Sequence, residues 1–387
     1  MSRNLGGRGR LSLPMRRSLL VLTPVLALAL AAPASATVRV DGRGWGHGIG
    51  LSQYGAYGYA LEEARDHAWI LQHFYPGTDL THGGSGRVRV RLTRSARPAL
   101  CGATRLRDAR GRRLALTAAH VYRVSRAGGA RYAVRDVTSG HLRARVAAPA
   151  TVSGGASWCL RGRADNGVRD GAYRGSAQLL PDGRRILVVN RVGLESYLRG
   201  VVGAEMPASW PAQALQVQAV IARSYALRAR AAGAPYDLFA DTRSQVYGGV
   251  GSEVPAASAA VRASRGEVVT YGGEVAQTFF FSSSGGQTAA NEEIWGTAPV
   301  PYLRSVADPY DRLSPYHRWT VTFRDREAAR RLADVSPGAL RSLKVVSRTA
   351  SGRAAVVAVR GKRGTARVAA STIQSALGLR STWFWLR

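Results

Sequence analysis

Glu205 stands in an apolar setting that suits acid catalysis. Its neighbours Ala204, Met206 and Trp210 solvate a carboxylate poorly, which favours the neutral form and raises the pKa of the acid. An acid that is still protonated near neutral pH can donate its proton to a leaving oxygen, as cleavage of a glycosidic bond requires. Glu205 also precedes a predicted helix over residues 212–231, whose dipole opposes this shift by about 1 kcal/mol or less, so we expect desolvation to dominate.

Arg223 is a second candidate, on that predicted helix. By the three-and-four spacing of a helix it shares one face with Val220 and Leu227, so its guanidinium falls on an apolar stripe and needs an anion or carbonyl groups. Two roles stay open. Arg223 could form a structural ion pair with Asp241 or Glu195, or it could hold a carboxylate or N-acetyl carbonyl of a substrate.

Two polar loops carry groups of the kind that bind sugars. One follows the apolar run 278–281 with hydroxyls and glycines, and the other spans residues 241–247. Plain turns are the alternative for both loops, and the sequence has no Gly-x-Ser-x-Gly elbow that would favour a serine nucleophile. The candidate substrate-binding residues in these loops and on the neighbouring helix are Ser283, Ser284, Gly285, Gly286, Gln245, Tyr247 and Tyr225.

A third polar loop lies near the start of the chain, where glycine occupies every second position over residues 42–50. His47, Gln53 and Tyr54 follow one another closely there and can contact a carbohydrate by stacking and hydrogen bonding. A packed structural turn is the alternative. The glycine spacing does not match the dinucleotide fingerprint, and no βαβ unit follows, so we exclude a nucleotide site.

The formal net charge is +31, nearly all of it from arginine. Such a surface attracts polyanions, although the preference for arginine over lysine could also reflect genomic base composition. Because no RNA- or DNA-binding motif is present, we expect anionic wall polymers rather than nucleic acid as partners.

The first 36 residues have the features of an export signal. Arg16 and Arg17 precede an apolar run over residues 19–32, and residues 34–36 form a small-residue cleavage site. The run is short for a membrane anchor, so cleavage is favoured over retention. We therefore expect a secreted protein, in the cell wall or at the outer face of the cytoplasmic membrane.

Cys101 and Cys159 are the only cysteines. In an exported chain such a pair predicts one disulfide, and two buried free thiols are the alternative. Their wide separation, with no histidine at ligand spacing, argues against a structural zinc site. We expect neither a metal nor a cofactor.

Helical and strand patterns are mixed without a regular βαβ order, which predicts an α+β fold with mixed sheets, several packed helices and a β-rich N-terminal insert. The predicted helices span residues 56–74, 193–202, 212–231, 255–263, 325–333 and 370–377. The predicted strands include residues 37–41, 88–92, 121–124, 132–134, 150–152, 267–271, 275–281, 319–323, 343–346 and 354–359, with a hairpin over 173–192.

Ordered motifs between about residues 173 and 384 resemble those of the SpoIID/LytB family of bacterial cell-wall proteins. A further stretch, residues 46–56 and 73–78, is also similar to the family, although many relatives carry it after the catalytic core. The predicted organisation is a signal peptide (1–36), a glycine-rich segment with a helix (37–85), a β-rich module (86–169) and a SpoIID-like catalytic domain (170–387). The motifs that carry the resemblance are residues 189–198, 203–207, 218–225, 241–247, 283–286, 301–303 and 379–384.

The resemblance implies lytic transglycosylase activity on the glycan strands of peptidoglycan, with Glu205 at the position of the catalytic glutamate. One carboxyl group suffices for this reaction, because the C6 hydroxyl of muramic acid replaces water as the nucleophile. Some relatives bind zinc near the serine–glycine loop, but Phe281, Ser282 and Ser284 occupy that region here. The alternatives are a non-catalytic module that stimulates an N-acetylmuramoyl-L-alanine amidase, and a general sugar-binding surface protein.

Overall fold

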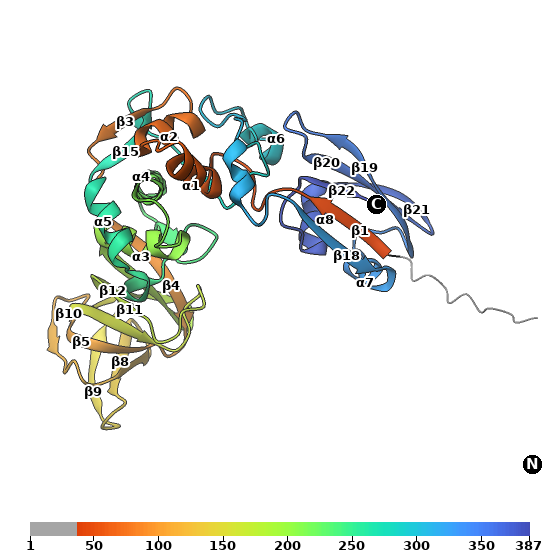
Figure 1. Ribbon diagram of the computed structural model, residues 1–387. Coiled ribbons are helices and arrows are strands. Elements are labelled where there is room, and N and C mark those ends of the chain that lie inside the picture. Colours follow the sequence, from red (N-terminus) through yellow and green to blue (C-terminus); the bar gives the residue numbers. More distant parts are fainter. Residues whose placement is uncertain (1–36) are drawn as a thin grey trace, which may run out of the picture. The chain divides into compact units, whose positions relative to one another are not determined.

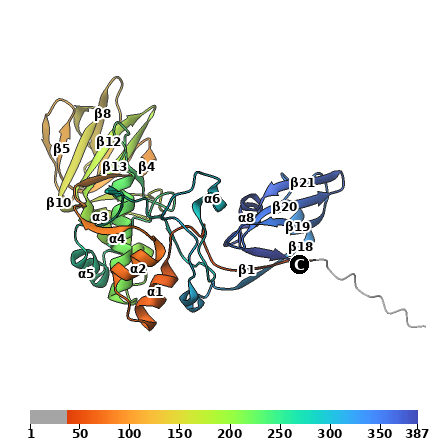
Figure 2. The same ribbon diagram turned by 90° about the horizontal axis from the view of Figure 1, so that it is seen from above.

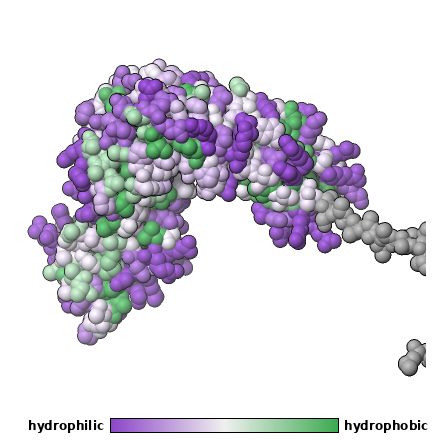
Figure 3. Space-filling model, viewed as in Figure 1, coloured by the Kyte–Doolittle hydropathy of each residue, from purple (hydrophilic) through white to green (hydrophobic). Residues whose placement is uncertain are grey.

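The computed structural model describes residues 37–387, so the predicted signal peptide, residues 1–36, lies outside the described residues. Helices and mixed sheets follow one another along the chain (Figure 1), which confirms the predicted α+β fold. The surface seen in Figure 3 is a mosaic in which hydrophilic residues predominate and apolar residues are scattered. Within residues 37–387, no helix is long and apolar enough to cross a membrane.

The largest sheet has eleven strands, nine of them in the order β14-β4-β13-β12-β10-β5-β7-β8-β9. On β4, Val88, Val90 and Leu92 alternate with arginines, so one face of the strand is buried. Strands on both sides of the expected boundary near residue 170 pair here, β4 with β13 and β10 with β12. The strands are β4 (Arg87–Ser95), β5 (Ala99–Asp108), β6 (Arg113–Ala115), β7 (Tyr122–Arg126), β8 (Arg131–Asp136), β9 (Leu142–Ala147), β10 (Ala150–Arg161), β11 (Ala172–Tyr173), β12 (Ser176–Asp182), β13 (Arg185–Gly193) and β14 (Leu238–Phe239).

The disulfide lies within this sheet. Cys101 of β5 stands opposite Cys159 of β10 in the antiparallel register, and the two sulfurs are bonded. The bond closes a separation of 58 residues and holds together the two ends of the β-rich segment. The pairing agrees with the disulfide that the two cysteines predict.

Helix α4 (Ala212–Arg228) lies at the centre of the helical part of the molecule. In both Figure 1 and Figure 2 it runs between the large sheet and the pair α1 and α2. One of its faces packs toward the sheet through Leu215 and Ala222, and another packs toward α1 and α2 through Val217 and Ile221. Because it is covered on several sides, α4 is apolar around most of its circumference. The other helices nearby are α3 (Leu194–Glu205), α5 (Pro255–Ala263), α1 (Gln53–Glu62) and α2 (His67–Phe74).

The single helix predicted over residues 56–74 is wrong, because the structure has two helices, α1 and α2, in this region. Ala64 adopts a left-handed conformation, with φ of 53°, and interrupts the helical path. Asp66 then caps α2 by accepting a hydrogen bond of 2.8 Å from the backbone N–H of Trp69. The apolar spacing continues across the break, so periodicity alone does not reveal it.

The first strand of the described chain pairs with strands near residues 320 and 385. Strand β1 (Thr37–Gly42) lies between β18 (Trp319–Arg324) and β22 (Phe384–Leu386), and their apolar face joins a core with α7 (Asp325–Arg331) and α8 (Ala370–Leu377). The remaining elements are β2 (Leu51–Ser52), β3 (Asp79–His82), β15 (Glu267–Tyr271), β16 (Glu274–Val275), β17 (Phe280–Phe281), α6 (Asn291–Trp295), β19 (Leu340–Arg348), β20 (Ala354–Gly361), β21 (Gly364–Ala369) and the 3₁₀ helices η1 (Gly249–Ser252) and η2 (Pro309–Leu313).

Candidate active site

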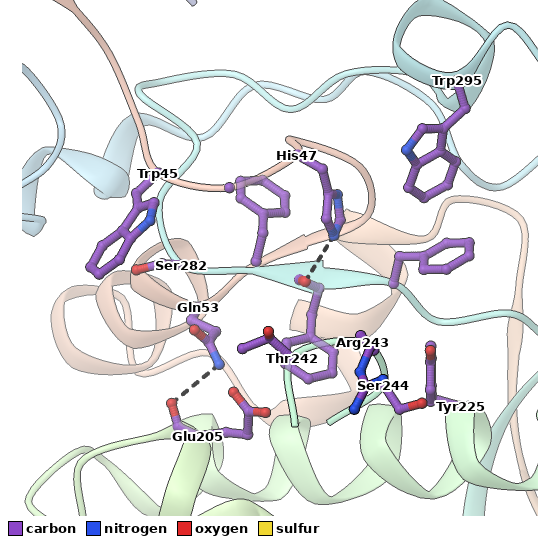
Figure 4. A pocket seen from close by; sticks show the side chains of 14 residues that line it. Trp45, His47, Gln53, Glu205, Tyr225, Thr242, Arg243, Ser244, Ser282 and Trp295 are labelled. Atoms are coloured by element: carbon purple, nitrogen blue, oxygen red, sulfur yellow. Dashed lines mark hydrogen bonds between the residues drawn. The ribbon is translucent and has the colours of Figure 1, made fainter. Parts of the chain in front are cut away.

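A cavity of about 540 Å³ opens beside the end of α3 (Figure 4). Several stretches that are distant in sequence contribute to its wall: the glycine-rich segment, the helical region around Glu205, the loop over residues 242–244, the strand that ends in the serine–glycine loop, and α6. The lining residues are Trp45, Gly46, His47, Gln53, Glu205, Tyr225, Thr242, Arg243, Ser244, Phe279, Phe280, Phe281, Ser282 and Trp295.

Glu205 is the last residue of α3 and is partly exposed to the cavity. Its Oε1 accepts a hydrogen bond of 2.7 Å from the backbone N–H of Val246. Burial raises the pKa of Glu205, and the hydrogen bonds from Val246 and Gln53 offset part of that rise. Figure 4 shows its side chain on the side of the cavity that carries Gln53 and Thr242.

The position of Glu205 at the end of α3 corrects the expected effect of a helix dipole. The sequence predicts that the N-terminal end of α4 favours the ionised acid. Glu205 instead lies in the last turn of α3, where the free carbonyl groups create a negative potential. This potential disfavours a carboxylate, so it acts in the same direction as desolvation.

Gln53 joins the glycine-rich segment to Glu205. Its Nε2 lies 3.2 Å from the backbone carbonyl oxygen of Glu205 and 3.2 Å from Oε1 of Gln218, and the side chain is buried. Residues 46–56, although far from Glu205 in sequence, therefore form part of the same cavity.

His47 also lines the cavity, but its ring nitrogens are already occupied. Nδ1 accepts a hydrogen bond of 3.0 Å from the N–H of Ile49, and Nε2 lies 3.1 Å from the carbonyl oxygen of Phe280. Burial lowers the pKa of His47 to about 4, so the ring is neutral with its proton on Nε2. The ring centroid lies 5.5 Å from that of Trp295, and His47 therefore offers an aromatic surface rather than a free hydrogen-bonding group.

The glycines around His47 permit close packing of this loop. Gly46 and Gly48 have φ of 121° and 89°. A Cβ at Gly46 would lie 2.6 Å from Cβ of Phe281, and one at Gly48 would lie 2.8 Å from the guanidinium of Arg353. Only glycine fits these positions without displacing the wall of the cavity.

The low pKa of His47 predicts a loss of stability in acid. Between about pH 6.5, where a histidine in the unfolded chain titrates, and pH 4, where folded His47 does, the unfolded state binds an extra proton. The stability that His47 contributes is thus fully present above pH 6.5 and falls as the pH decreases to 4, by about 3 kcal/mol at most. Urea unfolding at several pH values should show that the free energy of unfolding decreases less steeply with falling pH in His47→Asn than in the natural protein. Parallel losses in the two proteins would contradict the assignment.

The predicted substrate-binding residues of the serine–glycine loop do not line the cavity. Asp311, which is buried, accepts hydrogen bonds from Ser283 Oγ (3.0 Å) and from the backbone N–H groups of Ser284 and Gly285 (2.7 and 2.8 Å). Ser284 Oγ in turn accepts a hydrogen bond of 3.0 Å from the N–H of Gly286. Ser283, Ser284 and Gly285 thus satisfy a buried carboxylate, and Gly286 helps to shape the loop, which corrects the predicted role of all four residues.

Of the two roles predicted for Arg223, the structure supports the structural ion pair. Its guanidinium is fully buried and makes two hydrogen bonds of 2.9 Å to the carboxylate of Glu195. A third, of 3.1 Å, goes to the carbonyl oxygen of Glu267. Arg223 does not line the cavity, so its predicted contact with substrate is corrected to a buried ion pair.

Gln245 and Tyr247 are also buried away from the cavity lining, which corrects their predicted contact with substrate. Oε1 of Gln245 accepts a hydrogen bond of 2.9 Å from the hydroxyl of Tyr197, and the hydroxyl of Tyr247 donates one of 2.9 Å to Asn190. The loop that carries them reaches the cavity instead through its preceding residues, which include Arg243.

Of the two remaining predicted residues, Tyr225 lines the cavity and Tyr54 does not. The ring of Tyr54 packs against Trp210, with centroids 5.1 Å apart. Sequence reasoning missed Trp295, Arg243 and several other lining residues. The adjacent glycines drew attention to the loop around Trp45, but the short helix of Trp295 carries no comparable signal.

The side chains of Trp45, Trp295 and Arg243 give the cavity its binding character, and of these only the tryptophan of the glycine-rich loop is a candidate from the sequence. Trp45 and Trp295 each expose 42% of their surface, so their indole rings are available for stacking. The guanidinium of Arg243 is paired with Asp241 at 2.6 Å and still borders the cavity. Within residues 37–387, no cluster of three histidine, cysteine or acidic side chains is arranged to hold a metal ion.

Comparison with known proteins identifies residues 182–271 as a match to the family model SpoIID, stage II sporulation protein. The chain is 31% identical to stage II sporulation protein D of Bacillus subtilis over 217 residues, which cover 51% of this chain and 62% of that protein. It is 36% identical to an amidase enhancer of Bacillus subtilis over 140 residues, which cover 36% of this chain and 18% of that protein.

The matched segment includes Glu205 and Tyr225, whereas His47 and Gln53 precede it. The chain spans less than two thirds of the length of each of these relatives, 62% of the sporulation protein and 18% of the amidase enhancer. Residues 182–271 are thus similar to the SpoIID family, and the chain resembles both a sporulation protein and an amidase enhancer over part of its length.

Proposed function

We propose that this protein is a secreted lytic transglycosylase that cleaves the MurNAc–GlcNAc bond of peptidoglycan with Glu205 as its acid and base. One observation carries the proposal. Glu205 is the only acidic residue among those that line the cavity in the described chain, and its burial raises the pKa of the carboxyl group. A hydrolase of the usual kind needs two carboxyl groups, whereas intramolecular attack needs one.

The proposed reaction consumes no water. The protonated carboxyl of Glu205 donates its proton to the glycosidic oxygen as the bond from C1 of MurNAc to that oxygen breaks. The C6 hydroxyl oxygen of the same MurNAc then bonds to C1, and its proton passes to the Glu205 carboxylate. The products are a 1,6-anhydro-muramic end and a free GlcNAc hydroxyl, and Glu205 regains its proton.

The rest of the cavity wall suits a sugar chain. The exposed rings of Trp45 and Trp295 offer flat surfaces for pyranose faces, and Thr242 and Ser244 supply hydroxyl groups. Arg243 adds a positive charge that suits the carboxylate of muramic acid or of its peptide.

A second candidate function is stimulation of an N-acetylmuramoyl-L-alanine amidase without catalysis. The similarity to an amidase enhancer favours it. The same cavity would then bind glycan strands and present the wall to a partner enzyme, with Glu205 serving only as a hydrogen-bonding group.

Digestion of purified glycan strands, with and without their peptides, tests the proposal. We expect mass spectrometry to find anhydro-muramic ends, with a mass lower by one water than hydrolysis products. Reducing ends would indicate a hydrolase and contradict the proposed chemistry. If no bond is cleaved, while an added wall amidase works faster in the presence of the protein, the second function is correct.

A further inference from the structure

A second pocket, of about 510 Å³, lies on the sheet formed by β18, β1 and β22 and shares no lining residue with the cavity of Glu205. The three strands bury one face in the core through side chains such as Val40 and Phe384. Because side chains alternate along a strand, Arg39 and Asp41 belong to the opposite face, and Arg43, just after the strand, lines the same pocket. The pocket is therefore a feature of the outer face of this sheet.

The strand register brings four arginines together at this pocket. Arg39 of β1 and Arg387 exchange two backbone hydrogen bonds, of 3.1 and 2.9 Å. Arg43 follows β1 and Arg318 precedes β18, and both also line the pocket. Asp41 is the only acidic side chain among the lining residues of the described chain, so the side chains of the pocket, four arginines and one aspartate, carry a formal charge of +3.

Asp41 forms ion pairs with only two of these arginines, Arg39 and Arg387. Its carboxylate lies 3.1 Å from Nε of Arg39 and 3.1 Å from Nε of Arg387, and it accepts a hydrogen bond of 2.6 Å from Thr320. The hydrogen bond from Thr320 is the main cause of a lowered pKa of Asp41, so this acid is ionised. Its oxygens are occupied by these partners.

Arg43 and Arg318 have no acidic partner within residues 37–387. Nε of Arg43 is buried and lacks a hydrogen-bond acceptor there as well. Burial and the nearby charge of Arg318 both lower the pKa of Arg43, as expected for two cations that repel each other. An anion placed between the two side chains would offset this repulsion.

The pocket also has an aromatic wall. Trp385 is 36% exposed, and the guanidinium groups of Arg43 and Arg348 lie 5.5 and 4.9 Å from the centre of its ring. A flat apolar surface beside the guanidinium group of Arg43 suits a ligand that joins an anionic group to a sugar or polyol.

We propose that this pocket binds a phosphate group carried by a sugar or polyol polymer, with Arg43 and Arg318 as its anchors and Trp385 beside the polyol. A carboxylate has two oxygens in one plane and is satisfied by one or two guanidinium groups, as Asp41 illustrates. A phosphate is tetrahedral and can accept hydrogen bonds from two arginine forks that approach from different directions. The inference does not depend on Glu205 or on glycan cleavage.

Isothermal titration of the full chain with a glycerol phosphate oligomer tests the proposal. We expect saturable binding, and a Kd that rises about tenfold or more in Arg43→Gln/Arg318→Gln. The matched control is Arg105→Gln/Arg107→Gln, which removes two positive charges from exposed positions of β5. We expect its Kd to change about twofold or less, because only the general attraction decreases. Circular dichroism verifies that both variants are folded.

Several results would overturn the assignment. Equal weakening in the two double variants would mean that the whole surface charge binds the polymer, and unchanged binding in the first would exclude this pocket. An oligogalacturonate that binds as tightly, with the same dependence on Arg43 and Arg318, would make the ligand a carboxylate. If the first double variant does not fold, Arg318→Gln, at an exposed position, replaces it and is expected to weaken binding several-fold.

Discussion

Glu205→Gln is expected to reduce glycan cleavage by about 10²–10⁴-fold, the usual contribution of general acid–base catalysis. The amide has nearly the shape of the acid and keeps an oxygen that can accept the 2.7 Å hydrogen bond from the N–H of Val246. It cannot donate an acidic proton to the glycosidic oxygen. The rate of appearance of anhydro-muramic ends, measured with peptide-free strands, checks this prediction.

The matched control is Glu274→Gln, because the side chain of Glu274 is 80% exposed on β16. This variant should cleave glycan at the natural rate. Cleavage in the natural protein should also decline as the pH rises through the pKa of Glu205, since the protonated form is the active one. A Glu205→Gln protein that retains most of its activity would exclude Glu205 as the acid.

The second large effect concerns the buried ion pair of Glu195 and Arg223. Glu195→Ala is expected to lower the free energy of unfolding by about 3–5 kcal/mol, the cost of leaving a buried charge without its partner. The side chain of Arg223 has no exposed surface, whereas that of Glu195 is 31% exposed, so the cost comes from the arginine end of the pair. Urea or thermal unfolding followed by circular dichroism measures the change.

A surface pair of similar geometry provides the control. Arg304 makes two hydrogen bonds of 2.8 Å to Glu292, but its side chain is 35% exposed. We therefore expect Glu292→Ala to cost about 1 kcal/mol or less. If the two glutamate variants lose similar amounts of stability, burial of Arg223 does not make the loss of its ion-pair partner more costly.

The sequence predicted elements well where local chemistry marks their ends. Helix α5 begins at Pro255, whose fixed φ suits the first helical position, and α8 ends at Gly378, which adopts a left-handed conformation. Both helices were predicted with the bounds that the structure has. Glu205 and the glycine-rich loop were likewise found as candidates, because residue type and backbone freedom are visible in the sequence.

The serine–glycine loop shows what the sequence does not reveal. Its hydroxyl and N–H groups would suit a sugar equally well, and only the fold shows that Asp311, from η2, occupies them. Trp295 reaches the cavity from α6, a helix of five residues that is too short for a periodic pattern. Such residues can be assigned only once tertiary contacts are known.

The most direct test is a titration of Glu205 itself. Protein labelled with ¹³C in the glutamate side chains gives one carboxyl resonance per glutamate, and the resonance missing from Glu205→Gln identifies the group. We expect it to titrate above the ordinary range of glutamate, because the carboxyl is buried at the end of α3. A midpoint at or below the ordinary glutamate value would contradict its assignment as a proton donor.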